Sequence, residues 1–156
     1  MRSIRPQPRV RSLALAGLFA ALAAYLGRAQ GVIETPLWLR VFPDLKDPAL
    51  NRVMAWQGGL GLPDREYYLA PGDARFATAL EAYRAYLVTL ARLAGETNAN
   101  DVAQRVIALE TALAQTHATR EDSANIQKSN HVWTLKDFAA KAPGIDWAAF
   151  FKAAGL

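Results

Sequence analysis

The pattern of apolar and polar positions along the chain predicts a mainly helical protein. From Ala74 to about Ala94, apolar residues recur every three or four positions, which is the spacing of one helix face. Asp73 precedes this stretch as a potential cap, and Gly95 follows it where a helix would end. The expected inward residues are Phe76, Leu80, Tyr83, Leu87 and Leu90.

A second amphipathic stretch opens at Asn100 or Asp101 and runs to about Ala118. Its apolar positions predict that Val102, Val106, Leu109 and Leu113 face inward. The polar residues that follow, 116–132, are typical of a loop.

Two short helices are expected near the C-terminus. Thr134 to Asp137 has the form of a capping box, in which a threonine and an acid three residues later satisfy each other's backbone N–H groups. Asp146 can cap a last helix from Trp147 to Ala154, in which the aromatic side chains would be buried. These are Trp147, Phe150 and Phe151.

One β-hairpin is predicted at about residues 37–56. Leu37 to Phe42 and Arg52 to Trp56 are rich in β-branched and aromatic residues, and the intervening "PDLKDPALN" is dense in turn-forming residues. The stretch after the hairpin, "QGGLGLPDREYYLAPGD", connects it to the long helix. The fold class is therefore mainly α, a helical domain with one small β-hairpin.

The N-terminal segment has two interpretations. Residues 1–11 are basic, and Leu13 to Gly27 are fifteen apolar or small residues, as in a signal peptide. Arg28 and Gln30 fit a cleavage site badly, so there is no convincing signal peptide, and the run falls short of the about 20 apolar residues of a membrane span. A packed helix is favoured, and the localisation stays unknown. Its predicted apolar stripe comprises Leu15, Leu18, Leu22, Tyr25 and Leu26.

The net charge of +4 comes from the N-terminal segment. Residues 1–33 hold five of the 18 basic residues and no acid, so the remaining thirteen face all 14 acids, a net charge of −1. A nucleic-acid-binding domain needs clustered basic residues on its folded body. Nucleic acid is therefore excluded as a partner.

The sequence offers no self-contained active site. Cysteine is absent, and the two histidines, His117 and His131, do not form the His-Glu-x-x-His helix of zinc peptidases. No nucleophile elbow or phosphate-binding loop occurs, and the neighbouring acids indicate local ion pairs. We predict no catalytic residue, no metal ligand and no cofactor in this chain, and we interpret His117 as a helix-end residue that interacts with the helix dipole.

The stretch that follows the hairpin carries a family motif, "QGGLGLPDREYY". It resembles the non-catalytic N-terminal domain of the neprilysin-like zinc metallopeptidases, as does the preceding turn with Asp44, Lys46 and Asp47. Glu66 stands where that family usually has aspartate. The similarity extends over about residues 12–156, a partial N-terminal domain. The motif residues, which we expect to be structural, are Gln57, Gly59, Gly61, Leu62, Pro63, Arg65, Tyr67 and Tyr68.

The resemblance implies a fragment of a zinc-dependent metalloendopeptidase that cleaves oligopeptides. In such enzymes this piece forms part of the wall of the substrate chamber, zinc and the catalytic glutamate lie in a further domain, and that domain is the expected partner. The resemblance identifies no substrate-binding residue in this chain. A free-standing exported helical interaction module is the alternative. Because 156 residues cannot bury all of the chain's aromatic side chains, self-association is also expected.

Overall fold

The computed structural model describes residues 8–156, with the side chains of residues 17–125, 127–128 and 130–156. Residues 1–7 of the predicted basic segment lie outside this range, and residues 8–11 begin the first helix. The chain forms two compact units. Unit 1 comprises residues 1–35 and His131–Leu156, and unit 2 is Pro36–Asn130.

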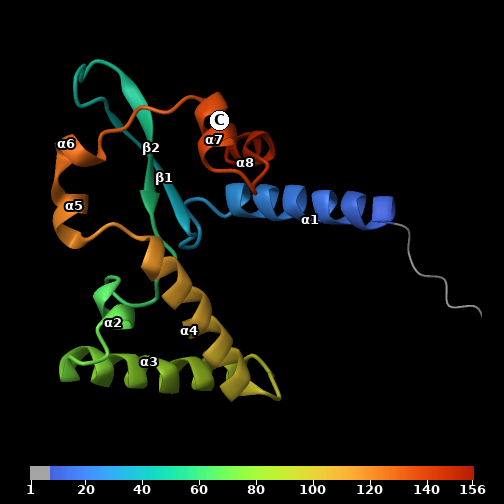
Figure 1. The fold of residues 1–156 in the computed structure, drawn as a ribbon, viewed down its shortest axis with the longest axis vertical. Helices are drawn as coiled ribbons and strands as arrows, with labels where there is room; N and C mark the ends of the chain where they lie inside the picture. Colours follow the sequence, from blue (N-terminus) through green and yellow to red (C-terminus); the bar gives the residue numbers. More distant parts are fainter. Residues whose placement is uncertain (1–7) are drawn as a thin grey trace, which may run out of the picture. The chain divides into compact units, whose positions relative to one another are not determined.

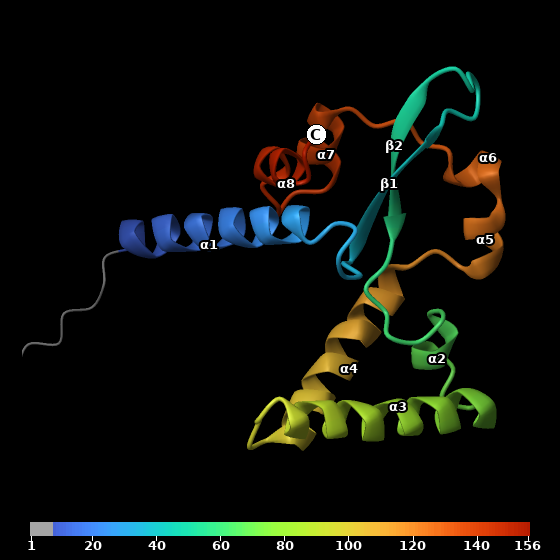
Figure 2. The ribbon, with the colours of Figure 1, turned by 180° about the vertical axis from the view of Figure 1, so that it is seen from behind.

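Unit 1 is built on the packing of α1 (Pro8–Arg28) against α8 (Trp147–Ala153), as Figures 1 and 2 both show. The contact face of α1 carries small residues. Ala23 is 1% exposed, and a Cβ added to Gly27 would lie 2.2 Å from the Phe150 carbonyl oxygen. The two backbones therefore approach as closely as the absence of a side chain allows.

The predicted helix at Leu13 to Gly27 is confirmed, but its predicted packing face is wrong. Leu18, Leu22 and Tyr25 are 63%, 48% and 56% exposed, whereas Leu26 of the predicted stripe is half-buried. The leucine stripe points away from α8 because the close approach of the two helices leaves room only for alanine and glycine. Leu15 lies among the residues whose side chains are not described.

Aromatic rings join α8 to α7 (Leu135–Lys141). The centroid of Phe138 lies 4.8 Å from that of Trp147 and 5.2 Å from that of Phe151. Phe150 is buried, whereas Trp147 and Phe151 are half-buried. The capping box of Thr134 and Asp137 and the cap by Asp146 are confirmed.

Unit 2 begins with the predicted hairpin. Strands β1 (Leu37–Pro43) and β2 (Asn51–Gln57) pair antiparallel, with Trp38 opposite Trp56. In the turn between them, Asp44 Oδ1 accepts hydrogen bonds from the backbone N–H groups of Lys46 at 2.7 Å and Asp47 at 2.9 Å. These bonds lower the pKa of Asp44, against which desolvation acts, and the ion pair with Arg52 lowers it further.

In unit 2, the two long helices α3 and α4 meet at an angle, and the short helix α2 lies between them (Figure 1). The long helix α3 (Ala74–Leu93) begins after its predicted cap Asp73 and is followed by Gly95, which has a φ of +84° and terminates it. Gly95 and the next residue donate to the carbonyls of Arg92 and Ala91, the Schellman pattern of a glycine-terminated helix. The helices are α2 (Glu66–Leu69), α3 (Ala74–Leu93), α4 (Ala99–Thr116), α5 (Arg120–Ala124) and α6 (Ile126–Ser129).

Two sequence predictions for unit 2 are wrong. The polar stretch 116–132 contains α5 and α6, which begin after the local caps Thr119 and Asn125. Helix α4 begins at Ala99, one residue before the predicted start, and of its predicted inward residues Leu109 is 63% exposed. The other three, Val102, Val106 and Leu113, are half-buried. Its buried face consists of Ala99, Ala103, Ile107, Glu110 and Ala114.

The apolar side chains predicted to face inward on α3 are only partly covered. Phe76, Leu80, Tyr83 and Leu87 are half-buried, and Leu90 is 42% exposed. Among residues 8–156, no helix combines the length and the hydropathy needed to span a bilayer.

Candidate functional site

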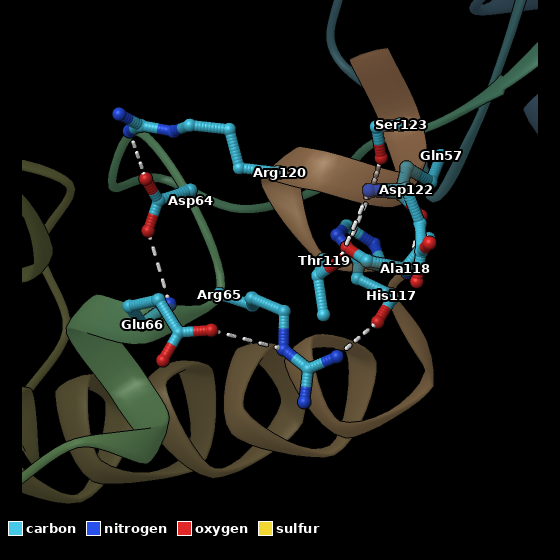
Figure 3. Close-up of polar contacts among 10 residues, drawn as sticks. All are labelled: Gln57, Asp64, Arg65, Glu66, His117, Ala118, Thr119, Arg120, Asp122 and Ser123. Carbon is cyan, nitrogen blue, oxygen red and sulfur yellow. Dashed lines mark hydrogen bonds and ion pairs between the residues drawn. The ribbon is translucent and has the colours of Figure 1, made fainter. Parts of the chain in front are cut away.

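The candidate site is the connection that runs from Gln57 at the end of β2 to Glu66 at the start of α2, here called the glycine loop. Gln57 joins it to the segment between α4 and α5, as Figure 3 shows. Its Oε1 accepts from the Ala118 N–H at 2.8 Å, and its Nε2 donates to the Ala118 carbonyl and the Ser123 hydroxyl, both at 3.3 Å. The side-chain amide of Gln57 thus pairs with the backbone N–H and C=O of Ala118, as a residue of a neighbouring strand would.

Arg65 makes a second connection to the same segment (Figure 3). Its Nη1 donates at 2.5 Å to the carbonyl of His117, which is the C-cap of α4. A cation at a helix C-terminus complements the partial negative charge of the last carbonyls. Arg65 Nε is buried and makes no hydrogen bond in this structure, with Glu66 Oε1 at 3.5 Å.

His117 is buried beneath this connection. Burial lowers the pKa of its imidazole, a hydrogen bond to the Gly58 carbonyl opposes the shift, and the Arg65 cation adds to it. The predicted position at the helix end is correct. The lowered pKa favours the neutral form of the ring over the cation that interacts favourably with a helix C-terminus.

Asp64 gives the glycine loop a third connection through its ion pair with Arg120 at the start of α5 (Figure 3). Its other oxygen accepts from the Glu66 N–H at 3.0 Å, at the start of α2. Together, Gln57, Asp64 and Arg65 hold residues 117–123 against the loop.

On the other side of the loop, Glu110 of α4 lies buried between two tyrosines. Tyr68 Oη donates to Oε2 at 2.7 Å, and Tyr83 Oη donates to Oε1 at 2.9 Å. The Tyr68 hydroxyl also accepts from the Leu62 N–H at 3.0 Å. Burial and the Glu110 carboxylate raise the pKa of both tyrosines, which therefore remain protonated donors.

Two glycines of the loop are required by close contacts. A Cβ on Gly61 would lie 2.0 Å from Tyr83 Oη, so a side chain there would displace the ring from Glu110. Gly59 has a φ of +83°, and a Cβ there would lie 3.0 Å from the Pro36 Cα. Backbone conformation and space both select glycine at that position.

The structure brings most of the motif residues into one network. Tyr67 is outside it, because its ring packs on Phe76 with a centroid separation of 4.9 Å. The sequence analysis missed Glu110, the acceptor at the centre of the network. Its signal is positional, since it lies three residues after Ile107 and four before Ala114, on the buried line of α4.

The arrangement is suited to holding a loop rather than to chemistry. The polar atoms of Gln57, Tyr68 and Glu110 bond to other groups of the chain. Within the part of the chain that the structure describes, His, Asp and Glu side chains form no group of three that could ligate a metal ion.

The chain matches a known protein family over nearly its whole length. Residues 12–156 match the model for the N-terminal part of peptidase family M13. Endothelin-converting enzyme 1 of Rattus norvegicus is 32% identical over 116 residues, which are 72% of this chain and 15% of that protein. The endothelin-converting enzyme homolog of Locusta migratoria is 32% identical over 110 residues, 69% of this chain and 15% of that protein.

Solved structures show the same similarity. The crystal structure of the Mycobacterium tuberculosis zinc metalloprotease Zmp1 in complex with an inhibitor matches 90% of this chain and 21% of that one, with a TM-score of 0.76 and 26% identity. The open state of Zmp1 matches 86% of this chain and 21% of that one, with a TM-score of 0.74 and 28% identity. The chain therefore spans well under a quarter of the length of these relatives.

Proposed function

The chain belongs to peptidase family M13, in its neprilysin-like N-terminal region, and we propose that it forms part of the substrate-chamber wall of a zinc metalloendopeptidase. The match over residues 12–156 carries this proposal, because it includes all of unit 2 with the complete glycine loop and most of unit 1. The resemblance seen in the motif is thereby confirmed as family membership.

The site supports a wall function. Three side chains of the glycine loop hold residues 117–123, and Glu110 holds the loop to the long helices through Tyr68 and Tyr83. Such a network holds the backbone of the glycine loop in place, as the wall of a chamber requires. Zinc would supply Lewis-acid activation of water in the catalytic part, for which the described residues here offer no ligand set.

Under this proposal the chain is inactive by itself, and its partner is the catalytic part of the enzyme. The test is a hybrid in which residues 1–156 replace the superposing segment of the M. tuberculosis metalloprotease. We expect the hybrid to cleave a fluorogenic oligopeptide in a chelator-sensitive reaction, and the isolated chain to show neither cleavage nor stoichiometric zinc binding.

Two variants of the hybrid control for the fold of the inserted chain. Glu110→Ala removes the central acceptor and should reduce the active fraction, whereas Leu109→Gln changes the neighbouring, exposed residue and should not. A folded hybrid without activity would contradict the proposal, as would zinc-dependent cleavage by the isolated chain.

The exposed apolar side chains also favour self-association of the isolated chain. Large apolar residues on both units are more than 60% exposed, among them Val32, Leu93 and Leu135. We expect concentration-dependent association and binding of a hydrophobic dye. A monomer without dye binding would instead favour the alternative, a free-standing interaction module.

A further inference from the structure

Helix α1 has a surface unlike that of an exposed helix. Residues 17–27, "GLFAALAAYLG", contain no charged side chain. A helix that is apolar all round is normally enclosed on every side. In this structure α8 covers only the face that carries Ala23 and Gly27.

The uncovered side carries the large residues. Leu18, Phe19, Leu22 and Tyr25, here called the Leu18 stripe, are 63%, 48%, 48% and 56% exposed. At about 100° per residue, Leu18, Leu22 and Tyr25 fall within an arc of about 60°, with Phe19 beside it. Four neighbouring large side chains make a continuous ridge that could pack into the groove of another helix.

We propose that the Leu18 stripe is the docking face for the remaining part of an M13 peptidase, a partner that presents an uncharged, apolar helical surface. The inference rests on the proposed function and assigns a place to that partner. The stripe lies inside the family match at residues 12–156, so it belongs to the region that this chain shares with the family.

The size of the relatives favours this occupant. This chain corresponds to 21% of the metalloprotease chain on which it superposes, so most of that enzyme lies outside the shared segment. The lack of charge on the stripe argues against a partner held by ion pairs. Four side chains per protomer also fall short of the about 800 Å² per partner that a stable pair of identical chains buries.

The experiment compares amide hydrogen exchange at residues 17–28 in the isolated chain and in the hybrid metalloprotease. Docking of the stripe should raise protection there by roughly tenfold or more, because burial of one leucine side chain is sufficient for such a factor. The double variant Leu18→Gln/Leu22→Gln should abolish the gain in the hybrid and leave protection in the isolated chain unchanged.

The matched control is Leu93→Gln/Leu109→Gln, which replaces two leucines of unit 2 that are 81% and 63% exposed. This pair should leave the protection of α1 as it is in the hybrid. An equal effect from both pairs would overturn the proposal, because it would show a general response to lost apolar surface.

Other occupants have their own signatures. A lipid surface would be favoured by the arginines of residues 1–33. If the isolated chain floats with vesicles of phosphatidylglycerol and phosphatidylcholine and the stripe variant abolishes flotation, the occupant is such a surface and the proposal is wrong. Stripe-dependent dimers in light scattering would overturn it in favour of a second copy. An active hybrid without added protection contradicts this inference alone, whereas a folded hybrid without activity contradicts the proposed function as well.

Discussion

The two compact units are stabilised by different interactions. In unit 1, α1 meets α8 through Ala23 and Gly27, and aromatic rings fill the space toward α7. In unit 2, side chains of the glycine loop bond to residues 117–123, and the loop's Leu62 N–H donates to Tyr68, whose hydroxyl donates to Glu110. Apolar packing constrains mainly the size of a residue, whereas a hydrogen-bond network constrains its identity. This difference explains why the specific motif lies in unit 2 and the alanine-rich helix in unit 1.

The largest expected effect tests the apolar side of the comparison. Phe150 is 2% exposed and packs against Trp147 and Phe151, so Phe150→Ala should cost about 3–5 kcal/mol of unfolding free energy. Chemical denaturation followed by tryptophan fluorescence measures the loss. Hydrogen exchange should show the loss of protection in α1 and α8 first, and equal losses in α3 and α4 would contradict the separation of the units.

The polar side is tested by Glu110→Ala. The hydroxyls of the buried Tyr68 and the half-buried Tyr83 would lose their acceptor, at a cost of about 2–4 kcal/mol. Glu110→Gln keeps an acceptor oxygen and should cost less than Glu110→Ala. If both variants unfold at the denaturant concentration of the unchanged chain, the network does not stabilise unit 2.

A smaller loss of stability is expected from a substitution at Gly61, which lies against the Tyr83 hydroxyl that donates to Glu110. Gly61→Ala would place a Cβ 2.0 Å from Tyr83 Oη, and the displacement should cost about 1–3 kcal/mol. Because the clash involves the hydroxyl, Tyr83→Phe should recover part of the loss in a double-mutant cycle. Additive effects of the two substitutions would show that they do not act on the same contact.

The smallest effect is a dependence on pH that belongs to unit 2. The pKa of His117 is lowered by burial, so below the ordinary histidine pKa of 6.5 the unfolded chain binds the proton more readily than the folded one. Stability should therefore be full above about pH 6.5 and decline as the pH falls toward the depressed value.

The control for this effect is His117→Gln, which removes the titrating group and should flatten stability over the same range. The carboxylates whose pKa values are lowered, such as Asp44 and Asp73, lose their contribution only at more acidic pH, below about 4. A decline between pH 6.5 and 5 that persists in His117→Gln would assign the effect to another group.

Local sequence determined most of the helix boundaries. Asp73, Thr134 and Asp146 cap helices through bonds to backbone groups two or three residues away, and Gly95 ends α3 through its own left-handed conformation. The hairpin followed in the same way from turn residues and paired apolar strands. Such features depend on near neighbours in the chain, so the sequence is sufficient to predict them.

The site was predicted only in part. The motif marked Gln57, Gly61, Arg65 and Tyr68 as structural, but the partners of Gln57, Arg65 and Tyr68 lie 42 to 66 residues away in most of their side-chain bonds. Glu110 appeared on the sequence as an ordinary helix glutamate. It became an acceptor for two hydroxyls only because α2 and α3 bring Tyr68 and Tyr83 to α4.

The sequence by itself determined the family, the mainly helical fold and the positions of the caps, because each depends on residue types at short or fixed spacing. The tertiary structure decided which face of each helix is covered. Leu109 and Leu18 lie on apolar faces of their helices and are both 63% exposed, whereas Glu110 and Gly27 are buried. The physical reason is that burial depends on how closely a distant segment approaches, and α8 approaches α1 only where Gly27 leaves space for its backbone.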